Sequence, residues 1–493
     1  MAAEQTLLPD PTVEDIIHSE VQGMAAMTFA YMWRFKNKNS SHEMDEIKNE
    51  RIESIIEYTG LFKNEMKFAK NFIRRCDVDN KNIIGNKTYA SFENMFYKIV
   101  IGHKQFKAFP KLNRCNDFNA FKLCQVHDDC YDNNHNYDEI CSGWIANCQK
   151  AWVINFCQRM ERNQTSDKNY YWIKVKEDDD FINYGDTSYS CQLEQNYETF
   201  YTDILTSFRN MIRPMYCDCV DDYIHTQSDT IRAISLLWSQ TSDNMVATGA
   251  RLVAKDRMIH IQLREGKLLP YGEIDKNTER WVPIPTFKYK RNFPNVAIYK
   301  NGTEYTLEEN KDFLPIHHLY AKTICLQKLT FDENHLLTGV RFNYEYLGQD
   351  LERHFKLEAK YVGFNYEYGN ITAQTKYHEQ SCKQLPELIL NNPDDPLKFN
   401  THPHDSKKNQ FITIRASDLI KDASQTTIPF FDLLEIAPNT SQPITAIELF
   451  HKGQLDGTSG GYVSLKIYPI NLTMYMNLPL INDSLIIDNT TIP

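Results

Sequence analysis

Three short segments in the second half of the chain share a pattern, and this repeat constrains the fold more than any other feature. The segments MVATGARL, HLLTGVRF and QPITAIEL occupy residues 245–252, 335–342 and 442–449. A turn and a second strand of alternating apolar residues follow each one, so each unit is expected to be a hairpin with one apolar face. Three such hairpins can bury these faces only against one another, which favours a pseudo-threefold, prism-like or sandwich arrangement.

The spacing of the repeat is unequal, with 90 residues from Thr248 to Thr338 and 107 from Thr338 to Thr445. Long insertions are therefore expected between the hairpins. The alternative interpretation is an irregular sandwich in which three hairpins look alike because these residue types suit strands.

The first half of the chain is rich in cysteine, and periodicity fades between residues 108 and 219. Clustered, even-numbered cysteine is typical of disulfide-bonded extracellular proteins. We expect the bridges to lie mostly within the first 219 residues, with Cys325 and Cys382 forming the one bridge of the second half. The twelve candidates are Cys76, Cys115, Cys124, Cys130, Cys141, Cys148, Cys157, Cys191, Cys217, Cys219, Cys325 and Cys382.

Apolar residues recur at helical spacing from Val13 to Phe35 and from Glu46 to Arg75, which predicts two long helices packed as a hairpin. The predicted fold class is therefore α+β and multidomain, with an N-terminal helical hairpin, a disulfide-rich region and a C-terminal all-β domain. The predicted domains are residues 1–107, a long-helix region; 108–234, a cysteine-rich region that continues the helical half; and 235–493, the β-rich domain with three weak hairpin repeats.

Cysteine usage and glycosylation motifs predict a secreted glycoprotein. Nine N-x-S/T sequons are candidate glycosylation sites, at Asn39, Asn86, Asn163, Asn301, Asn370, Asn439, Asn471, Asn482 and Asn489. The N-terminus carries Glu4, Asp10 and Glu14 where a signal peptide would be apolar, so we expect a presequence to be missing from this sequence. No apolar run is long enough to span a membrane. A net charge of -11 argues against a nucleic-acid-binding surface.

The segment FKLCQVHDDCYD, residues 121–132, has the His-Asp spacing of secretory calcium-dependent phospholipases, which makes His127 and Asp128 weak catalytic candidates. In that chemistry the histidine activates water and the aspartate holds calcium, with help from a glycine-rich loop upstream. No glycine occurs between His103 and Ser142, so this loop is absent. The favoured interpretation is that Cys124 and Cys130 belong to the disulfide framework.

Other catalytic or metal-binding patterns are weaker still. The Cys217-x-Cys219 pair lacks the paired spacing of a structural zinc site, and the chain has no P-loop, dinucleotide fingerprint or GxSxG motif. We therefore expect no metal, no cofactor and no enzymatic activity.

The turns of the β-rich half combine tyrosine with asparagine, aspartate and glycine, in NYEYLGQD, FNYEYGN and QLDGTSGGY. Such turns suit lectin-like glycan recognition, in which a sugar ring stacks on an aromatic face and amide or carboxylate groups bond its hydroxyls. The candidate ligand-binding residues are Tyr346, Tyr366 and Tyr462. A glycan or an extracellular protein is the expected partner; the alternatives are a structural matrix glycoprotein that self-associates and a phospholipase-like hydrolase using His127.

Longer motifs make the chain similar to a family of secreted arthropod proteins, chiefly from insects, that share a domain of unknown function. The similar segments include EVQGMAAMTFAYMW, MYCDCVDD, LREGKLLPYGEI, HDSKKNQFITI, KDASQTTIPFFD and HKGQLDGTSGGYVSLKIYP. The resemblance implies a secreted protein with a helical, cysteine-rich front and a β-rich back. It implies no activity.

Overall fold

A computed structural model gives the fold, and it divides the chain into two compact units: Met1–Asn71 with Asn471–Pro493, and Phe72–Ile470. Nearly all described residues belong to the second unit. The structure describes residues 72–73, 83–102, 121–122, 144–159, 168–191, 197–201, 203–205, 210–220, 230–285, 287–289, 296–300, 303–317, 321–332, 334–347, 352–399 and 403–471, with scattered single positions elsewhere.

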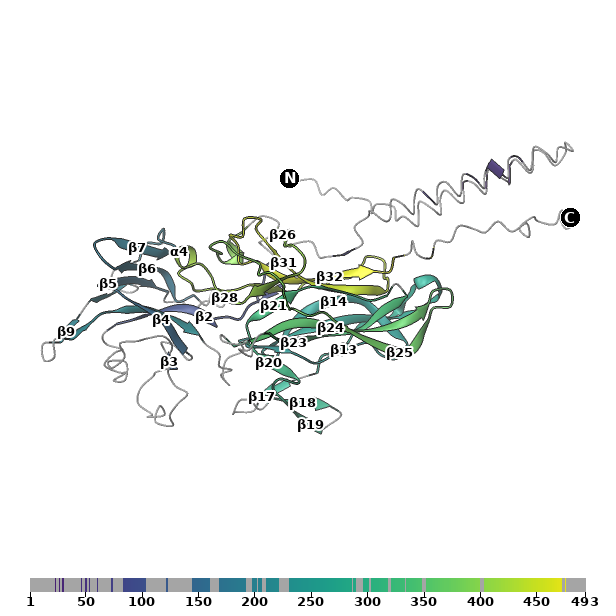
Figure 1. The fold of residues 1–493 in the computed structure, drawn as a ribbon, viewed down its shortest axis with the longest axis horizontal. Helices are drawn as coiled ribbons and strands as arrows, with labels where there is room; N and C mark the ends of the chain where they lie inside the picture. The colour runs from purple at the N-terminus through teal and green to yellow at the C-terminus, as the bar shows by residue number, and fades with distance from the viewer. Residues whose placement is uncertain are drawn as a thin grey trace, which may run out of the picture. The chain divides into compact units, whose positions relative to one another are not determined.

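Three long hairpins form the centre of the second unit (Figure 1), and they are the three segments of the sequence repeat. Each hairpin lies in a sheet with the same strand order. The second hairpin strand pairs in parallel with a short strand, which pairs in turn with an antiparallel edge strand. The hairpins are β14 (Met245–Lys255) with β15 (Met258–Leu268), β23 (His335–Leu347) with β24 (Glu352–Asn365), and β31 (Ile444–Gly453) with β32 (Tyr462–Pro469). The short parallel strands are β12 (Ala233–Ser235), β21 (Thr323–Leu326) and β30 (Phe430–Asp432), and the edge strands are β20 (Phe313–Pro315), β27 (Gln410–Thr413) and β1 (Tyr89–Ala90).

The repeated threonine marks a break in strand register in every hairpin. The register shifts across Thr248 in β14, across Thr338 in β23 and across Thr445 in β31. A bulge increases the local twist of a strand and bends it. The shared Thr-Gly or Thr-Ala step of the sequence repeat is therefore the point at which each sheet curves in the same way.

The three sheets close on one another because the chain that belongs to each sheet also contributes a short segment to the next sheet. β13 (Ser239–Gln240) follows β12 and pairs with β23, and β22 (Lys328–Thr330) follows β21 and pairs with β31. Ile436, just after β30, exchanges backbone hydrogen bonds of 2.9 Å with Ala250 in β14. The cycle protects the first-strand edge of each hairpin and produces a prism-like body, here called the three-sheet body, from the described residues of 72–90 and 231–470.

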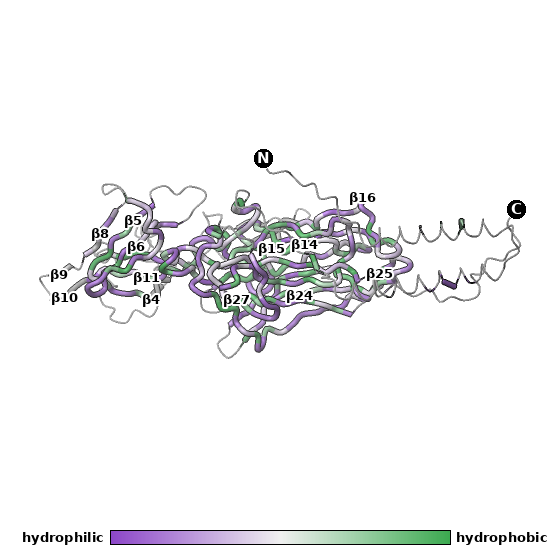
Figure 2. The backbone as a smooth tube through the Cα atoms, turned by 90° about the horizontal axis from the view of Figure 1, so that it is seen from above, coloured by the Kyte–Doolittle hydropathy of each residue, from purple (hydrophilic) through white to green (hydrophobic). Residues whose placement is uncertain are grey.

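The interior of the three-sheet body is apolar and is supplied by all three hairpins. Leu263, Tyr361 and Leu465 are fully buried in one continuous core. Hydrophobic positions along β14, β15 and β24 are green in Figure 2. Burial of such side chains stabilises the fold by about 1.5–3 kcal/mol each, so this shared core is a main source of the stability of the body.

The remaining elements extend or decorate these sheets. They are β16 (Ile274–Trp281), β17 (Phe287–Tyr289), β18 (Val296–Lys300), β19 (Thr303–Leu307), β25 (Asn370–Glu379), β26 (His404–Asp405), β28 (Arg415–Ala416), β29 (Thr427–Ile428), the short helix α4 (Leu419–Asp422), and the 3-10 turns η5 (Pro270–Gly272) and η6 (Pro396–Lys398).

Within the same compact unit, the described strands between Phe96 and Val220 form a smaller sandwich, here called the small domain, which lies between β1 and β12 in the sequence. One of its sheets has the order β2-β11-β4-β3 and the other the order β7-β6-β5-β8, with β9 and β10 as a two-stranded addition. Val100, Phe156, Ile173 and Tyr216 meet in its core, so the two sheets pack face to face. The strands are β2 (Phe96–Ile101), β3 (Phe121–Lys122), β4 (Trp144–Lys150), β5 (Val153–Gln158), β6 (Tyr170–Lys176), β7 (Phe181–Gly185), β8 (Tyr197–Tyr201), β9 (Asp203–Leu205), β10 (Asn210–Ile212) and β11 (Met215–Val220).

A buried charge cluster joins the small domain to the three-sheet body. The ammonium of Lys168, just before β6, lies 2.5 Å from an Asp422 carboxylate oxygen and 2.7 Å from Asp395. Thr426 donates a hydrogen bond of 2.6 Å to Asp422. Burial would raise the pKa of Asp422, but the charges of Lys168 and Lys398 outweigh it and hold the pKa below its usual value. The carboxylate is therefore ionised in the folded protein.

The predicted α+β class is wrong for the part of the chain that the structure describes, which is nearly all β. The helix with defined bounds there, α4, has four residues, and no helical hairpin occurs among the described residues. The predicted helices at 13–35 and 46–75 fall almost entirely outside them; isolated described positions such as Gly23 and Glu50 are helical.

The cysteine-rich region was also predicted to continue the helical half, and its described part consists of strands. Buried Ile154 and Phe156 alternate along β5 as a strand requires. Cysteine and tyrosine occupy both faces of these strands, for example Cys157 and Tyr170 beside Tyr171. Mixed occupancy of this kind hides the period-two pattern from sequence inspection.

Candidate functional site

Two neighbouring turns at one end of the three-sheet body display a group of tyrosines, here called the tyrosine platform: Tyr271, Tyr366 and Tyr368. Tyr271 follows β15, whereas Tyr366 and Tyr368 follow β24. The Tyr271 side chain is 65% exposed and that of Tyr368 is 66% exposed. The Tyr271 and Tyr366 ring centroids lie 5.9 Å apart with the rings nearly perpendicular, as aromatic pairs prefer.

The two turns hold each other through backbone contacts. Tyr271 N–H donates a hydrogen bond of 2.7 Å to the Tyr366 carbonyl oxygen. A Cβ on Gly369, whose φ is +65°, would overlap the backbone of Leu269 and Pro270. The Asn365 carboxamide oxygen accepts hydrogen bonds from the backbone N–H groups of Glu367 and Tyr368. Only glycine allows so close an approach, so the sequence Tyr-Gly fixes the platform in one geometry.

Tyr271 has a left-handed backbone conformation, with φ 63° and ψ 22°. This conformation costs any residue other than glycine about 1–2 kcal/mol, because the Cβ lies too close to a backbone carbonyl oxygen. Such conformations cluster at binding and catalytic sites, where the surrounding structure enforces them. Here the preceding Pro270 and the hydrogen bond to Tyr366 enforce it.

The platform lies where the second strands of the three hairpins end. Tyr271 comes shortly after β15, Tyr366 comes directly after β24, and Ile470 comes directly after β32. A Cβ on Gly272 would lie 3.4 Å from the Tyr366 ring and 3.8 Å from the Ile470 side chain. The pseudo-threefold topology therefore brings together three turns that are far apart in sequence.

The outer face of the second sheet also gathers aromatic side chains, but their faces are already occupied. The Lys360 ammonium lies 4.2 Å from the centroid of the Trp238 ring and 5.5 Å from that of Tyr377. The Arg341 guanidinium lies 4.7 Å from the Trp238 ring and pairs with Glu358 at 2.6 Å. Burial, followed by the charge of Arg341, lowers the pKa of Lys360. These contacts stabilise the sheet itself.

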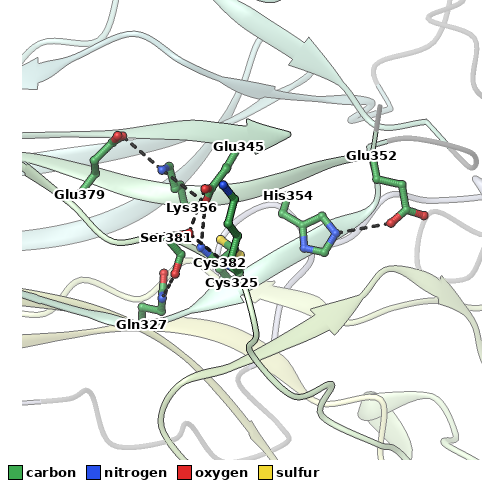
Figure 3. Close-up of a disulfide and its surroundings, with 10 residues drawn as sticks. Cys325, Gln327, Glu345, Glu352, His354, Lys356, Glu379, Ser381 and Cys382 are labelled. Carbon is green, nitrogen blue, oxygen red and sulfur yellow. Dashed lines mark hydrogen bonds and ion pairs between the residues drawn. A yellow bond between two sulfur atoms is a disulfide. The ribbon is translucent and has the colours of Figure 1, made fainter. Parts of the chain in front are cut away.

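Further along the same face, a disulfide anchors the segment after β25 (Figure 3). The Lys356 ammonium lies 3.3 Å from Glu379 and 3.7 Å from Glu345, and Glu345 accepts the Cys382 N–H at 2.7 Å. Burial would raise the pKa of Glu345, but the Cys382 hydrogen bond and the Lys356 charge keep it lowered. The group is internally satisfied and holds the Cys325–Cys382 bridge against the sheet.

Comparison with known protein families gives one match, to a family described as a domain of unknown function, DUF4803, over residues 8–263. This match covers more than half of the 493 residues. The chain belongs to the DUF4803 family. No curated protein matches it. The DUF4803 segment includes the small domain and ends within β15, so the tyrosine platform lies beyond the matched residues.

The three tyrosines chosen from the sequence are not brought together in this DUF4803 protein. Tyr366 belongs to the tyrosine platform. Tyr346 lies on β23, 48% exposed, with its ring 5.5 Å from that of Tyr344. Tyr462 begins β32 and is half-buried, 5.9 Å from the ring of Phe430. Sequence inspection missed Tyr271 and Tyr368, although each precedes a glycine, in PYG and in EYG.

The described cysteines are bonded. Disulfides join Cys148 to Cys217, Cys157 to Cys191, and Cys325 to Cys382, and Cys219 is also disulfide-bonded. The predicted pairing of the last two cysteines of the chain is thus present, and Cys217 is not available as a metal ligand. Cys76, Cys115, Cys124, Cys130 and Cys141 lie outside the described residues, as do His127 and Asp128.

Of the candidate glycosylation sites, Asn86, Asn370 and Asn439 are exposed and Asn471 is half-buried. The other five, at positions 39, 163, 301, 482 and 489, lie outside the described residues.

Neither a metal site nor a membrane helix emerges from the part of the chain that the structure describes. No group of three or more His, Cys, Asp or Glu side chains there could hold a metal ion, and no helix is long and apolar enough to cross a membrane. His260 and His451 are buried as neutral rings: burial lowers the pKa of each to about 4. His451 contacts the Gly460 carbonyl oxygen at 3.0 Å, so its role is in packing.

Proposed function

We propose that this chain is a non-enzymatic, lectin-like binding protein whose tyrosine platform binds a glycan. The observation that carries the proposal is Tyr271, which keeps a left-handed backbone while the residue remains 65% exposed. A residue needed only to complete the turn would be glycine, which takes this conformation without cost. The exposed tyrosine ring therefore has a role beyond completing the turn.

The chemistry of the platform suits a sugar. The exposed Tyr271 and Tyr368 rings offer flat apolar faces to the C–H side of a pyranose, and their hydroxyls both donate and accept hydrogen bonds. Glu273 and Glu367 are exposed in the same two turns and add acceptors for sugar hydroxyls. Because the two turns are interlocked, little conformational entropy is lost on binding.

An extracellular location is part of the proposal. Disulfides persist in oxidising compartments, and the exposed sequons at Asn86, Asn370 and Asn439 are accessible for glycosylation. The resemblance to secreted proteins of arthropods, chiefly insects, points the same way. Asn370 directly follows Gly369, so a glycan attached there would stand beside the platform.

A glycan array tests the proposal with the full chain, produced by secretion so that its disulfides form. Each hit is repeated with Tyr271→Ala, Tyr368→Ala and Tyr271→Gly. We expect each variant to bind at least tenfold more weakly, since stacking on an aromatic ring is lost. Tyr271→Gly should also raise the stability of the protein by about 1 kcal/mol, because glycine relieves the left-handed strain. Weaker binding with higher stability is the signature of a strained binding residue.

Two control variants separate the platform from other causes. Tyr377→Ala removes a tyrosine that is 61% exposed on the outer face of the second sheet, and binding should persist. Asn370→Gln removes the sequon beside the platform and should preserve or strengthen binding. Binding that survives Tyr271→Ala and is lost with Tyr377→Ala would place the site on the other surface.

Two other outcomes would replace the proposal. A chain that binds no glycan but associates with itself or with matrix proteins would be a structural glycoprotein. Calcium-dependent hydrolysis of phospholipid vesicles that disappears in His127→Gln would identify the protein as a hydrolase, against the missing glycine loop.

A further inference from the structure

The sheet β7-β6-β5-β8 of the small domain has one face in the core and one face outward. Ile154, Phe156, Ile173 and Val175 point into the core and are buried. Because side chains alternate along a strand, their neighbours point outward. The strand register places Val153, Lys176, Phe181 and Tyr201 in one outward row, and Asn155, Lys174, Asn183 and Thr199 in the next.

Two lysines and two aromatic rings give this outward surface its character, and we call it the lysine–aromatic face: Lys174, Lys176, Phe181 and Tyr201. Tyr201 is 63% exposed and Phe181 is 40% exposed. The ammonium groups of Lys174 and Lys176 lie 4.9 and 5.8 Å from the centroid of the Phe181 ring. Both positive charges therefore gather around one exposed ring.

These lysines differ from two buried lysines of the three-sheet body that have carboxylate partners. Lys452 lies 2.8 Å from Asp432, and Lys466 lies 2.8 Å from Asp405. No carboxylate of the described residues lies within ion-pair distance of Lys174 or Lys176, and none of the eight outward positions in the two rows is acidic.

The surroundings set the limits of this face. Beyond the second row, the disulfide between Cys157 and Cys191 and a hydrogen bond of 3.0 Å from Trp172 Nε1 to the Tyr189 carbonyl close the surface. At the other end, the turn between β6 and β7 contains Glu177, which accepts a 2.5 Å hydrogen bond from Tyr216, and the exposed acids at 178–180. An anion must therefore approach across the open rows.

We infer that the lysine–aromatic face binds an anionic polysaccharide, one bearing sulfate or carboxylate groups. The two ammonium groups, which have no carboxylate partner among the described residues, attract such anions, and sugar rings between the anionic groups stack on Phe181 and Tyr201. A linear chain of sugars can follow the flat rows of a sheet, since cross-strand neighbours are about 5 Å apart. This site is independent of the tyrosine platform in both position and ligand charge.

Heparin, hyaluronan and uncharged dextran serve as probes on the full, oxidised chain at near-physiological salt. We expect heparin or hyaluronan to bind, and dextran not to bind. The double variant Lys174→Gln/Lys176→Gln should bind at least tenfold more weakly, and Tyr201→Ala should also weaken binding. Added salt should weaken heparin binding by the wild type more steeply than binding by the double variant, because the double variant has fewer charges for salt to screen.

A matched control removes the same charge elsewhere. Lys407→Gln/Lys408→Gln changes two exposed lysines of the three-sheet body and should leave heparin binding unchanged, as should Tyr271→Ala. No binding of either anionic glycan, or an equal loss in both double variants, would overturn the inference. Equally tight binding of a single-stranded DNA oligonucleotide would also overturn it, since the face would then select polyanions without regard to sugars.

Discussion

In the three-sheet body each sheet borrows a segment from the neighbouring unit, whereas in the small domain disulfides link strands that share a smaller core. Cys148–Cys217 joins β4 to β11, and Cys157–Cys191 joins β5 to the segment that covers its outer end. Among its described residues the body contains the Cys325–Cys382 bridge, which holds a surface segment. A large core closed by strand exchange therefore replaces covalent links, and a small core depends on them.

The difference also separates the two proposed binding surfaces. The tyrosine platform is made of turns that the closed body holds rigidly, through backbone contacts that only glycine permits. The lysine–aromatic face is the open side of a sheet whose other side is fully used in the core. Loops on a rigid scaffold and open sheet faces are both common recognition surfaces, but they suit different ligands: the first a single sugar unit, the second an extended chain.

The strongest test of the comparison is to break the contact between the regions. Asp422→Ala leaves the Lys168 ammonium with Asp395 alone and removes the acceptor of Ser417 and Thr426. Removing one partner of a buried ion pair costs about 3–5 kcal/mol. Calorimetry should then resolve two unfolding transitions in place of one.

Asp179→Ala is the control for that experiment, because this carboxylate is exposed on the small domain. It should leave a single transition at the wild-type temperature. A single, unshifted transition in Asp422→Ala would mean that the charge cluster does not couple the two regions.

A smaller and more local effect is expected from the disulfide of the small domain. The double variant Cys157→Ser/Cys191→Ser opens a loop with a sequence separation of 34 residues, which should cost about 2–4 kcal/mol. Hydrogen exchange should increase in β5, β6 and β8 and stay unchanged in β14 and β15. Equal loosening of the hairpins would contradict the view that the two regions are stabilised separately.

Sequence reasoning located the hairpins of the body because their apolar residues alternate cleanly, as in Ile259, Ile261 and Leu263 of β15. It failed in the small domain because Cys157 and Tyr171 lie on outward positions that resemble core positions. Contacts between residues far apart in the sequence could not be predicted either. The closing contact of Ile436 with Ala250 joins residues 186 positions apart in the sequence, and no local pattern encodes it.

The candidate site was predicted in part, for a similar reason. Tyr366 was chosen because tyrosine in a polar turn suggests recognition. Its neighbour Tyr271 comes from a different hairpin, and only the pseudo-threefold topology brings the two within 5.9 Å. Tyr462, chosen on the same grounds, is half-buried against Phe430, because the turn before it folds back onto the sheet.

Mild acid gives the gentlest way to distinguish the two regions, because the body contains buried histidines and the described part of the small domain contains none. Burial lowers the pKa of His260 and of His451 to about 4, below the ordinary value of 6.5. The unfolded chain therefore takes up protons at each position near pH 6.5, while the folded body does so only near pH 4. The contribution of each buried histidine to stability is fully present above pH 6.5 and falls by about 3 kcal/mol as the pH drops toward 4.

In His451→Gln the unfolding temperature of the body should fall less steeply between pH 6.5 and pH 4. In His404→Gln, which alters an exposed residue of β26, the slope should equal that of the wild type. A slope that His451→Gln leaves unchanged would show that carboxylates, not this buried ring, make the body sensitive to acid.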